Sequence, residues 1–263
     1  MPQTFVFSLL FLFTLCSLLS AQPKSEGPTY STGFNTATRI GKELRDALKP
    51  ALRGKVHSHP VALETDVRPF VKTVEYPDET EPLRLVFISV GFVDLMNNVS
   101  HAKAIDRIQP GYFQRYLVSL SDESGEFSLK DLPGIADRRY WTDDILNDQQ
   151  SNFNQMVGML IAIELSHHYS GRYKKYSDRL AESDNVEPIN NILRPAEWED
   201  ALSAGVQNAL DCGYGIDGLK VLYDAIEKMP KRPNWVDYFL PEHAQVAKLK
   251  KDLQKIENRY FAQ

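Results

Sequence analysis

The segment that decides the fold reads Met159-Leu160-Ile161-Ala162-Ile163-Glu164-Leu165-Ser166-His167-His168. Its first five residues are apolar and continue an apolar run that begins at Met156, which indicates a buried helix. An acid and two imidazoles come directly after them, and such groups rarely lie in a core without a partner. Titratable groups at the end of a buried helix are typical of a functional site.

The order of these residues is close to the zinc-peptidase motif H-E-x-x-H. In that motif two histidines at i and i+4 share one helix face and bind the metal, and the glutamate is the general base for the bound water. Here Glu164 and His167 occupy the second and last positions, and Ile163 stands in place of the first histidine. A Glu–His pair at i, i+3 is also a common pair on a helix surface, so the rest of the chain must decide its meaning.

The clearest predicted strand covers residues 83–90, which are β-branched and apolar, and it ends at Gly91. Helical spacing begins at Phe92 and continues toward Ile108, and Pro110 stops it. The sequence therefore predicts a strand that passes directly into a helix.

The remaining segments are mostly helical in pattern. Apolar spacing predicts helices at 36–48, 112–120, 154–176, 195–211, 216–229 and 241–261. Residues 55–82 contain four prolines and little periodicity, so we expect extended or loop structure with a short strand at 67–74. The predicted fold class is α+β, mostly helical, with a small sheet.

The order of these elements resembles the family of zinc metallopeptidases that includes the CAAX prenyl protease and the HtpX heat-shock protease. In that family a strand runs into a Gly-Leu helix start, and the H-E-x-x-H helix comes next. A helix with E-x-D-x-x-G then carries the third ligand, before a turn like A-G-Y-D-P. The corresponding stretches here are 88–92, 163–167, 200–205 and 212–217, and the resemblance covers about residues 83–262.

This resemblance implies a zincin-like domain over residues 83–263, with Glu164 as the catalytic base and His167 and Asp200 as zinc ligands. It also implies a degenerate site, because Ile163 removes a ligand and Asp200 is one methylene shorter than the family's glutamate. Catalytic zinc takes three protein ligands and an open fourth position. We therefore expect a pseudo-peptidase with a vestigial zinc site, acting as a binding or scaffold domain with a peptide or protein partner in the cleft.

Other interpretations stay open at this level. One is a divergent but active zinc-dependent endopeptidase with Glu164 as general base and an unidentified third ligand. His101 could supply that ligand from a neighbouring helix, whereas His168 points about 100° round the helix from His167. Another is a helical interaction module whose similarity to the family is accidental. Residues 100–152 form an insertion that is long for the family.

A buried Glu164 without a metal needs a compensating partner, because an unpaired buried carboxylate is costly. The nearest basic residues along the chain are Arg172 and Lys174. We expect one of them to neutralise Glu164 if no metal does.

The first 21 residues carry no charged side chain and end in Ser20-Ala21, which is a secretory signal pattern. We expect cleavage after Ala21 and export to the periplasm or the extracellular space; the alternative is a membrane tether formed by an uncleaved segment. Residues 22–33 are predicted to be a disordered lead-in, and 34–82 an N-terminal helix and extended segment. No later apolar run approaches the ~20 residues of a membrane span.

Composition sets further bounds. The formal net charge is −5 with acids and bases interspersed, which argues against a nucleic-acid partner because that needs a strongly basic face. Removal of Cys16 with the signal leaves only Cys212, so no intramolecular disulfide stabilises the mature chain. With 43% hydrophobic residues in 263, the chain can form a core instead.

Overall fold

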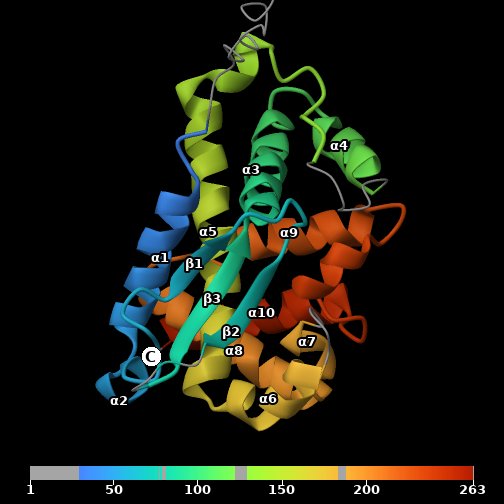
Figure 1. The fold of residues 1–263 in the computed structure, drawn as a ribbon. Helices are drawn as coiled ribbons and strands as arrows, with labels where there is room; N and C mark the ends of the chain where they lie inside the picture. The colour runs from blue at the N-terminus through green and yellow to red at the C-terminus, as the bar shows by residue number, and fades with distance from the viewer. Residues whose placement is uncertain (1–29, 77, 79–80, 122–128, 183–187, 263) are drawn as a thin grey trace, which may run out of the picture.

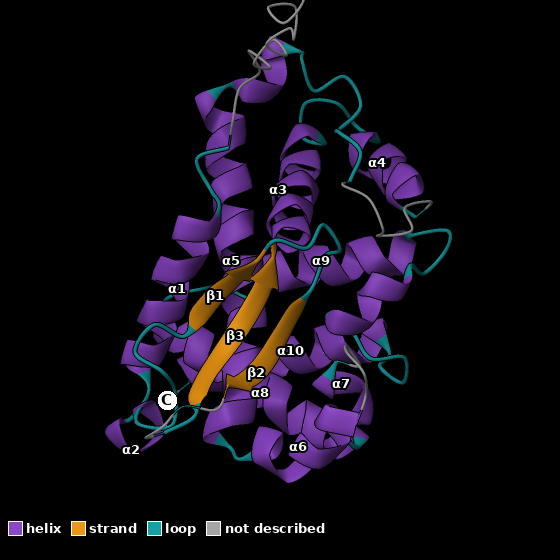
Figure 2. Ribbon diagram, viewed as in Figure 1, coloured by secondary structure: helices purple, strands orange, loops and turns teal. Residues whose placement is uncertain are grey.

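The computed structural model describes residues 30–76, 78, 81–121, 129–182 and 188–262. Helices dominate these residues, and three strands form a small mixed sheet (Figure 1 and Figure 2). This confirms the predicted class, α+β and mostly helical.

The elements succeed one another along the chain with short connections. Their bounds are α1 (Phe34–Ala47), α2 (Pro50–Arg53), β1 (Val61–Glu64), β2 (Val71–Tyr76), β3 (Leu83–Ser89), α3 (Val90–Ile105), α4 (Tyr112–Leu120), α5 (Asp143–Tyr169), α6 (Arg172–Glu182), α7 (Ile189–Ile192), α8 (Pro195–Asp211), α9 (Asp217–Lys228) and α10 (Val246–Phe261). Short 3-10 helices cover Arg138–Trp141 and Asn234–Tyr238.

The long helix α5 is the centre of the fold, and α1, α3, α8, α9 and the sheet pack around it (Figure 1). It starts with Asp143 and Asp144, whose charges suit the positive end of a helix dipole. It stops before Gly171, where φ is 75° and favours glycine. The predicted helix at 154–176 is therefore wrong at both ends: α5 begins earlier, and α6 is a separate helix.

The sheet has the order β1-β3-β2. β1 pairs in parallel with β3, with Val61 opposite Val86, and β2 pairs antiparallel to β3, with Thr73 opposite Val86. Residues 34–82 thus supply two of the strands and α1, so this segment shares one core with residues 83–262.

The transition from β3 to α3 agrees with its prediction. Ser89 caps α3, since its Oγ accepts a hydrogen bond from the Phe92 amide at 2.9 Å. Gly91 is required by a close approach, because a Cβ atom there would lie 1.9 Å from the Val67 carbonyl oxygen.

Most other elements also match. The helices predicted at 112–120 and 195–211 have the observed bounds of α4 and α8, and α1, α9 and α10 differ at their ends. The strand expected at 67–74 is β2, shifted toward its C-terminal side, while β1 and α7 had no predicted counterpart.

The start of the described chain is fixed to the body of the protein. Thr32 is 3% exposed and its hydroxyl donates to Asn97 Oδ1, and Tyr30 OH lies 3.0 Å from His101 Nδ1. Residues 30–33 therefore differ from the disordered lead-in that their composition suggests. Residues 1–21, the predicted signal, and 22–29 lie outside the described residues.

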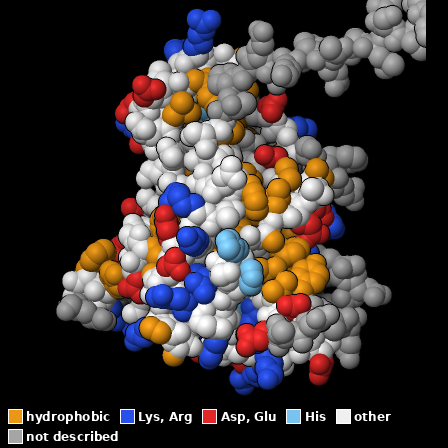
Figure 3. Space-filling model, turned by 60° about the vertical axis from the view of Figure 1, so that its left-hand side comes forward, with side chains coloured by type: hydrophobic (Ala, Val, Ile, Leu, Met, Phe, Trp, Pro, Cys, Tyr) orange, Lys and Arg blue, Asp and Glu red, His pale blue; other side chains and the backbone are white. Residues whose placement is uncertain are grey.

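Two properties bear on the surroundings of the protein. None of the helices in the described parts of the chain combines the length and apolar character needed to span a bilayer. On the face drawn in Figure 3, basic and acidic side chains are interleaved.

Candidate functional site

Glu164 lies on the face of α5 that packs against the sheet, and it is 2% exposed. Its Oε2 accepts a hydrogen bond from the Thr73 amide at 2.9 Å, and its Oε1 accepts one from Asn190 Nδ2 at 3.1 Å. The Thr73 hydroxyl lies 2.6 Å from Oε2 and 2.8 Å from the Glu164 carbonyl oxygen. The carboxyl group thus joins α5 to β2 and to α7.

The partners of Glu164 are neutral. Arg172, an expected partner, instead donates from Nη1 to Ser170 Oγ at 2.8 Å, and Lys174 is exposed. The expectation of a basic partner was wrong, because the carboxyl group faces the sheet while these residues lie beyond the end of α5.

Burial raises the pKa of Glu164 to about 7, although the hydrogen bonds from Thr73 and Asn190 act in the opposite direction. The protonated form fits the geometry well. A protonated Oε2 can donate to the Thr73 hydroxyl, which is then free to donate to the Glu164 carbonyl oxygen. Neutral Glu164 therefore satisfies every polar group in this contact.

His167 lies one turn further along α5 and is fully buried. Neither ring nitrogen has a hydrogen-bond partner, and Asn190 Oδ1 is also without one among the described residues. Burial lowers the pKa of His167 to about 3; the charges of Arg172 and His168 lower it further, and the Asn190 side chain opposes the shift. The imidazole is therefore neutral across physiological pH.

Asp200 and Ile163 lie at the contact of α5 with α8. The Ser166 hydroxyl donates to the Ala201 carbonyl oxygen at 3.3 Å, and Gly205 packs against the backbone of Ile163. Asp200 itself is exposed on α8, whereas His167 has no exposed surface. The structure thus brings Glu164 and His167 into the core and leaves Asp200 outside it.

The other histidines considered as ligands are bound elsewhere. His101 Nε2 donates to the Tyr140 carbonyl oxygen at 2.7 Å, and its Nδ1 contacts Tyr30. His168 Nε2 donates to the Leu85 carbonyl oxygen on β3 at 2.9 Å. Each therefore has a structural hydrogen bond of its own.

Sequence reasoning missed Thr73 and Asn190, the two partners of Glu164. Thr73 falls within the strand predicted at 67–74, so its alternation with Val71 and Val74 could have placed it on the buried face. Asn190 belongs to the four-residue helix α7, which is too short to give a periodic signal.

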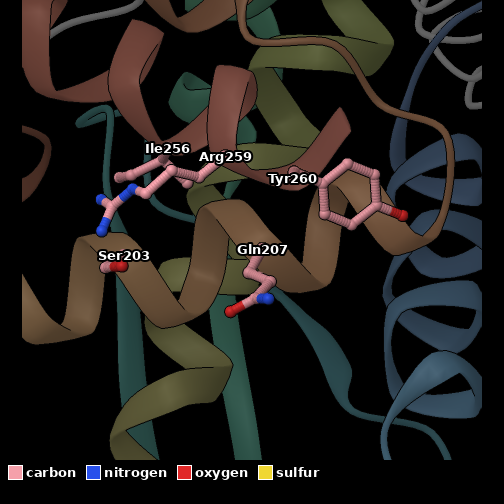
Figure 4. A pocket seen from close by; sticks show the side chains of 5 residues that line it. All are labelled: Ser203, Gln207, Ile256, Arg259 and Tyr260. Atoms are coloured by element: carbon pink, nitrogen blue, oxygen red, sulfur yellow. The ribbon is translucent and has the colours of Figure 1, made fainter. Parts of the chain in front are cut away.

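The described pockets lie away from this pair. One is a cavity of about 110 Å³ between α8 and α10, lined by Ser203, Gln207, Ile256, Arg259 and Tyr260 (Figure 4). It adjoins a wider groove of about 270 Å³ along the same two helices. Neither is lined by Glu164, His167 or Asp200.

No group of three or more histidine, cysteine, aspartate or glutamate side chains within the described residues is arranged to hold a metal ion. No family model matches the chain, and neither a curated protein nor a solved structure matches it. The function must therefore be inferred from the geometry of the residues themselves.

Proposed function

We propose that this protein is an exported, non-catalytic binding or scaffold protein with a zincin-like arrangement of helices, in which Glu164 and His167 belong to the core. The observation that carries the proposal is the environment of Glu164, whose carboxyl oxygens are bonded to Thr73 and Asn190 at 2% exposure. Export rests on the signal pattern of residues 1–21.

A catalytic glutamate in a zinc peptidase has to reach the metal-bound water next to the substrate. Glu164 instead faces a strand and a short helix that together exclude solvent from it. The expected ligand set does not fit zinc either, because His167 is buried and Asp200 is exposed. Retention of Glu164 is explained by its contacts without any catalytic role.

The test is the metal content of the purified protein, measured by mass spectrometry without chelators beside a His167→Ala variant. We expect zinc far below one per chain in both proteins. Near-stoichiometric zinc that disappears in His167→Ala would overturn the proposal.

One observation favours a second candidate, the divergent zinc endopeptidase. Two buried residues, His167 and Asn190, have polar atoms without a partner among the described residues, and unsatisfied buried groups are uncommon unless something unseen completes them. This candidate requires zinc in the wild type and peptide cleavage that is lost in Glu164→Gln. Cleavage that survives Glu164→Gln would eliminate it.

A further inference from the structure

A basic pocket lies where β2 and β3 meet the junction of α5 and α6. It has a volume of about 230 Å³, and its charged lining consists of Lys55, Arg84, Lys174 and Glu75. Glu164 and His167 are not part of its wall. What this pocket binds is therefore independent of whether the Glu164–His167 pair holds a metal.

The charges in the pocket do not cancel. Glu75 pairs with Arg84 at 3.4 Å, which leaves Lys55 and Lys174 as an uncompensated formal charge of about +2. Lys55 donates to the Tyr169 carbonyl oxygen at 3.1 Å, and an ammonium group has two further hydrogens to offer. Lys174 is exposed at the mouth.

Backbone groups add to this positive field. Gly171, with φ 75°, and Lys174 line the pocket at the start of α6, which has 11 residues. The first amides of a helix have no intrahelical acceptor, and the helix dipole makes this end attractive to anions. The positive end of α6 and both lysines therefore act at one place.

His168 supplies an independent sign of an incomplete site. It lines the pocket at 5% exposure and donates from Nε2 to Leu85, so the proton is on Nε2. Its Nδ1 has no hydrogen-bond partner among the described residues. A buried acceptor without a partner in the wall of a pocket is a group that a bound ligand or ordered water satisfies.

We propose that this pocket binds a phosphate group, held by Lys55, Lys174 and the start of α6. A dianionic phosphate matches the uncompensated charge, whereas a carboxylate would neutralise only half of it. The group is present both in inorganic phosphate and in phosphate esters, and the two sources are separated by the experiment.

The test is isothermal titration calorimetry of the full-length mature protein at low ionic strength, with inorganic phosphate and with glycerol phosphate. Tighter binding of inorganic phosphate assigns the pocket to the free ion, and tighter binding of glycerol phosphate assigns it to an ester. Absence of binding for both up to about 10 mM would overturn the proposal.

Three variants locate the binding. Lys174→Gln removes an exposed charge at the mouth, and we expect about tenfold weaker binding, the effect of one charge-assisted hydrogen bond. Glu75→Gln removes the carboxylate of the pocket wall and is expected to tighten binding several-fold, a gain that damage to the fold would not produce. Lys42→Gln makes the same charge change on exposed α1 and should leave binding unchanged. Equal weakening by Lys42→Gln and Lys174→Gln, or no tightening by Glu75→Gln, would show general charge attraction and overturn the site.

Discussion

Gly205 on α8 packs directly against Ile163 on α5, where a Cβ atom added at position 205 would lie 2.6 Å from both the amide nitrogen and the Cα atom of Ile163. The two helices cross at the position where a zinc peptidase would carry its first histidine. The close approach of the backbones holds the Ile163 side chain in the core at 5% exposure.

We expect Gly205→Ala to destabilise the protein, because backbone atoms of α5 cannot move aside as a flexible side chain can. The expected loss in free energy of unfolding is about 1–3 kcal/mol, as for overpacked cores, measured by urea denaturation. Gly54→Ala is the matched control, since its nearest neighbour is 4.0 Å away and its φ is −62°. An unchanged unfolding midpoint for Gly205→Ala would contradict the close packing of α5 and α8.

The stability contributed by Glu164 should fall as the pH rises. Its pKa is about 7 in the folded state against an ordinary value of 4.5, so the folded protein retains a proton that the unfolded chain loses. The contribution is fully present below pH 4.5 and is lost toward pH 7, by about 3 kcal/mol in total. The difference in unfolding free energy between wild type and Glu164→Gln should track this course. Exposed Glu242 provides the control, and a pH-independent difference for Glu164→Gln would refute the shift.

His167→Leu is expected to stabilise the protein at pH 7 by about 1–3 kcal/mol, because it removes buried nitrogens that lack a partner among the described residues. The pKa of His167 is about 3 in the folded state against an ordinary 6.5. Its neutral form is favoured on folding, so stability is present above pH 6.5 and is lost as the pH falls toward 3. His167→Leu should therefore also reduce acid sensitivity in thermal unfolding.

His168→Leu is the neighbouring control for this prediction. It loses the hydrogen bond to the Leu85 carbonyl oxygen and should lower stability at pH 7. If His167→Leu were destabilising as well, His167 would have to possess a bound partner, as the zinc candidate requires.

The fixed start of the described chain depends on Gln149, which is 1% exposed on α5. Its Nε2 donates to Asn97 Oδ1 at 2.9 Å and lies 3.1 Å from Thr32 Oγ1 and 3.3 Å from Ser100 Oγ. Gln149→Leu leaves these groups unsatisfied, and we expect a loss of about 1–3 kcal/mol in denaturant unfolding. Faster amide exchange at residues 30–33 should accompany it.

Exposed Gln114 on α4 provides the control for that change. Gln114→Leu should alter neither stability nor exchange at residues 30–33. Wild-type exchange at these residues in Gln149→Leu would mean that the polar cluster does not hold the segment in place.

The sequence by itself determined the elements whose signals are local. Pro195 and the apolar spacing after it defined α8, and Ser89 with Gly91 marked the change from strand to helix. The start of α5 was missed because its first turns, from Asp143 to about Asn152, are mainly polar and carry little apolar period.

Only the tertiary structure decided the character of the candidate site. Glu164 and His167 were found from their spacing, but Thr73 lies 91 residues and Asn190 26 residues from Glu164 along the chain. Helical periodicity reports which side of a helix is apolar and does not report which distant strand or short helix covers it. For the same reason the exposure of Asp200 depended on how α8 packs on α5, since the orientation of one helix against another is set by contacts far apart in sequence.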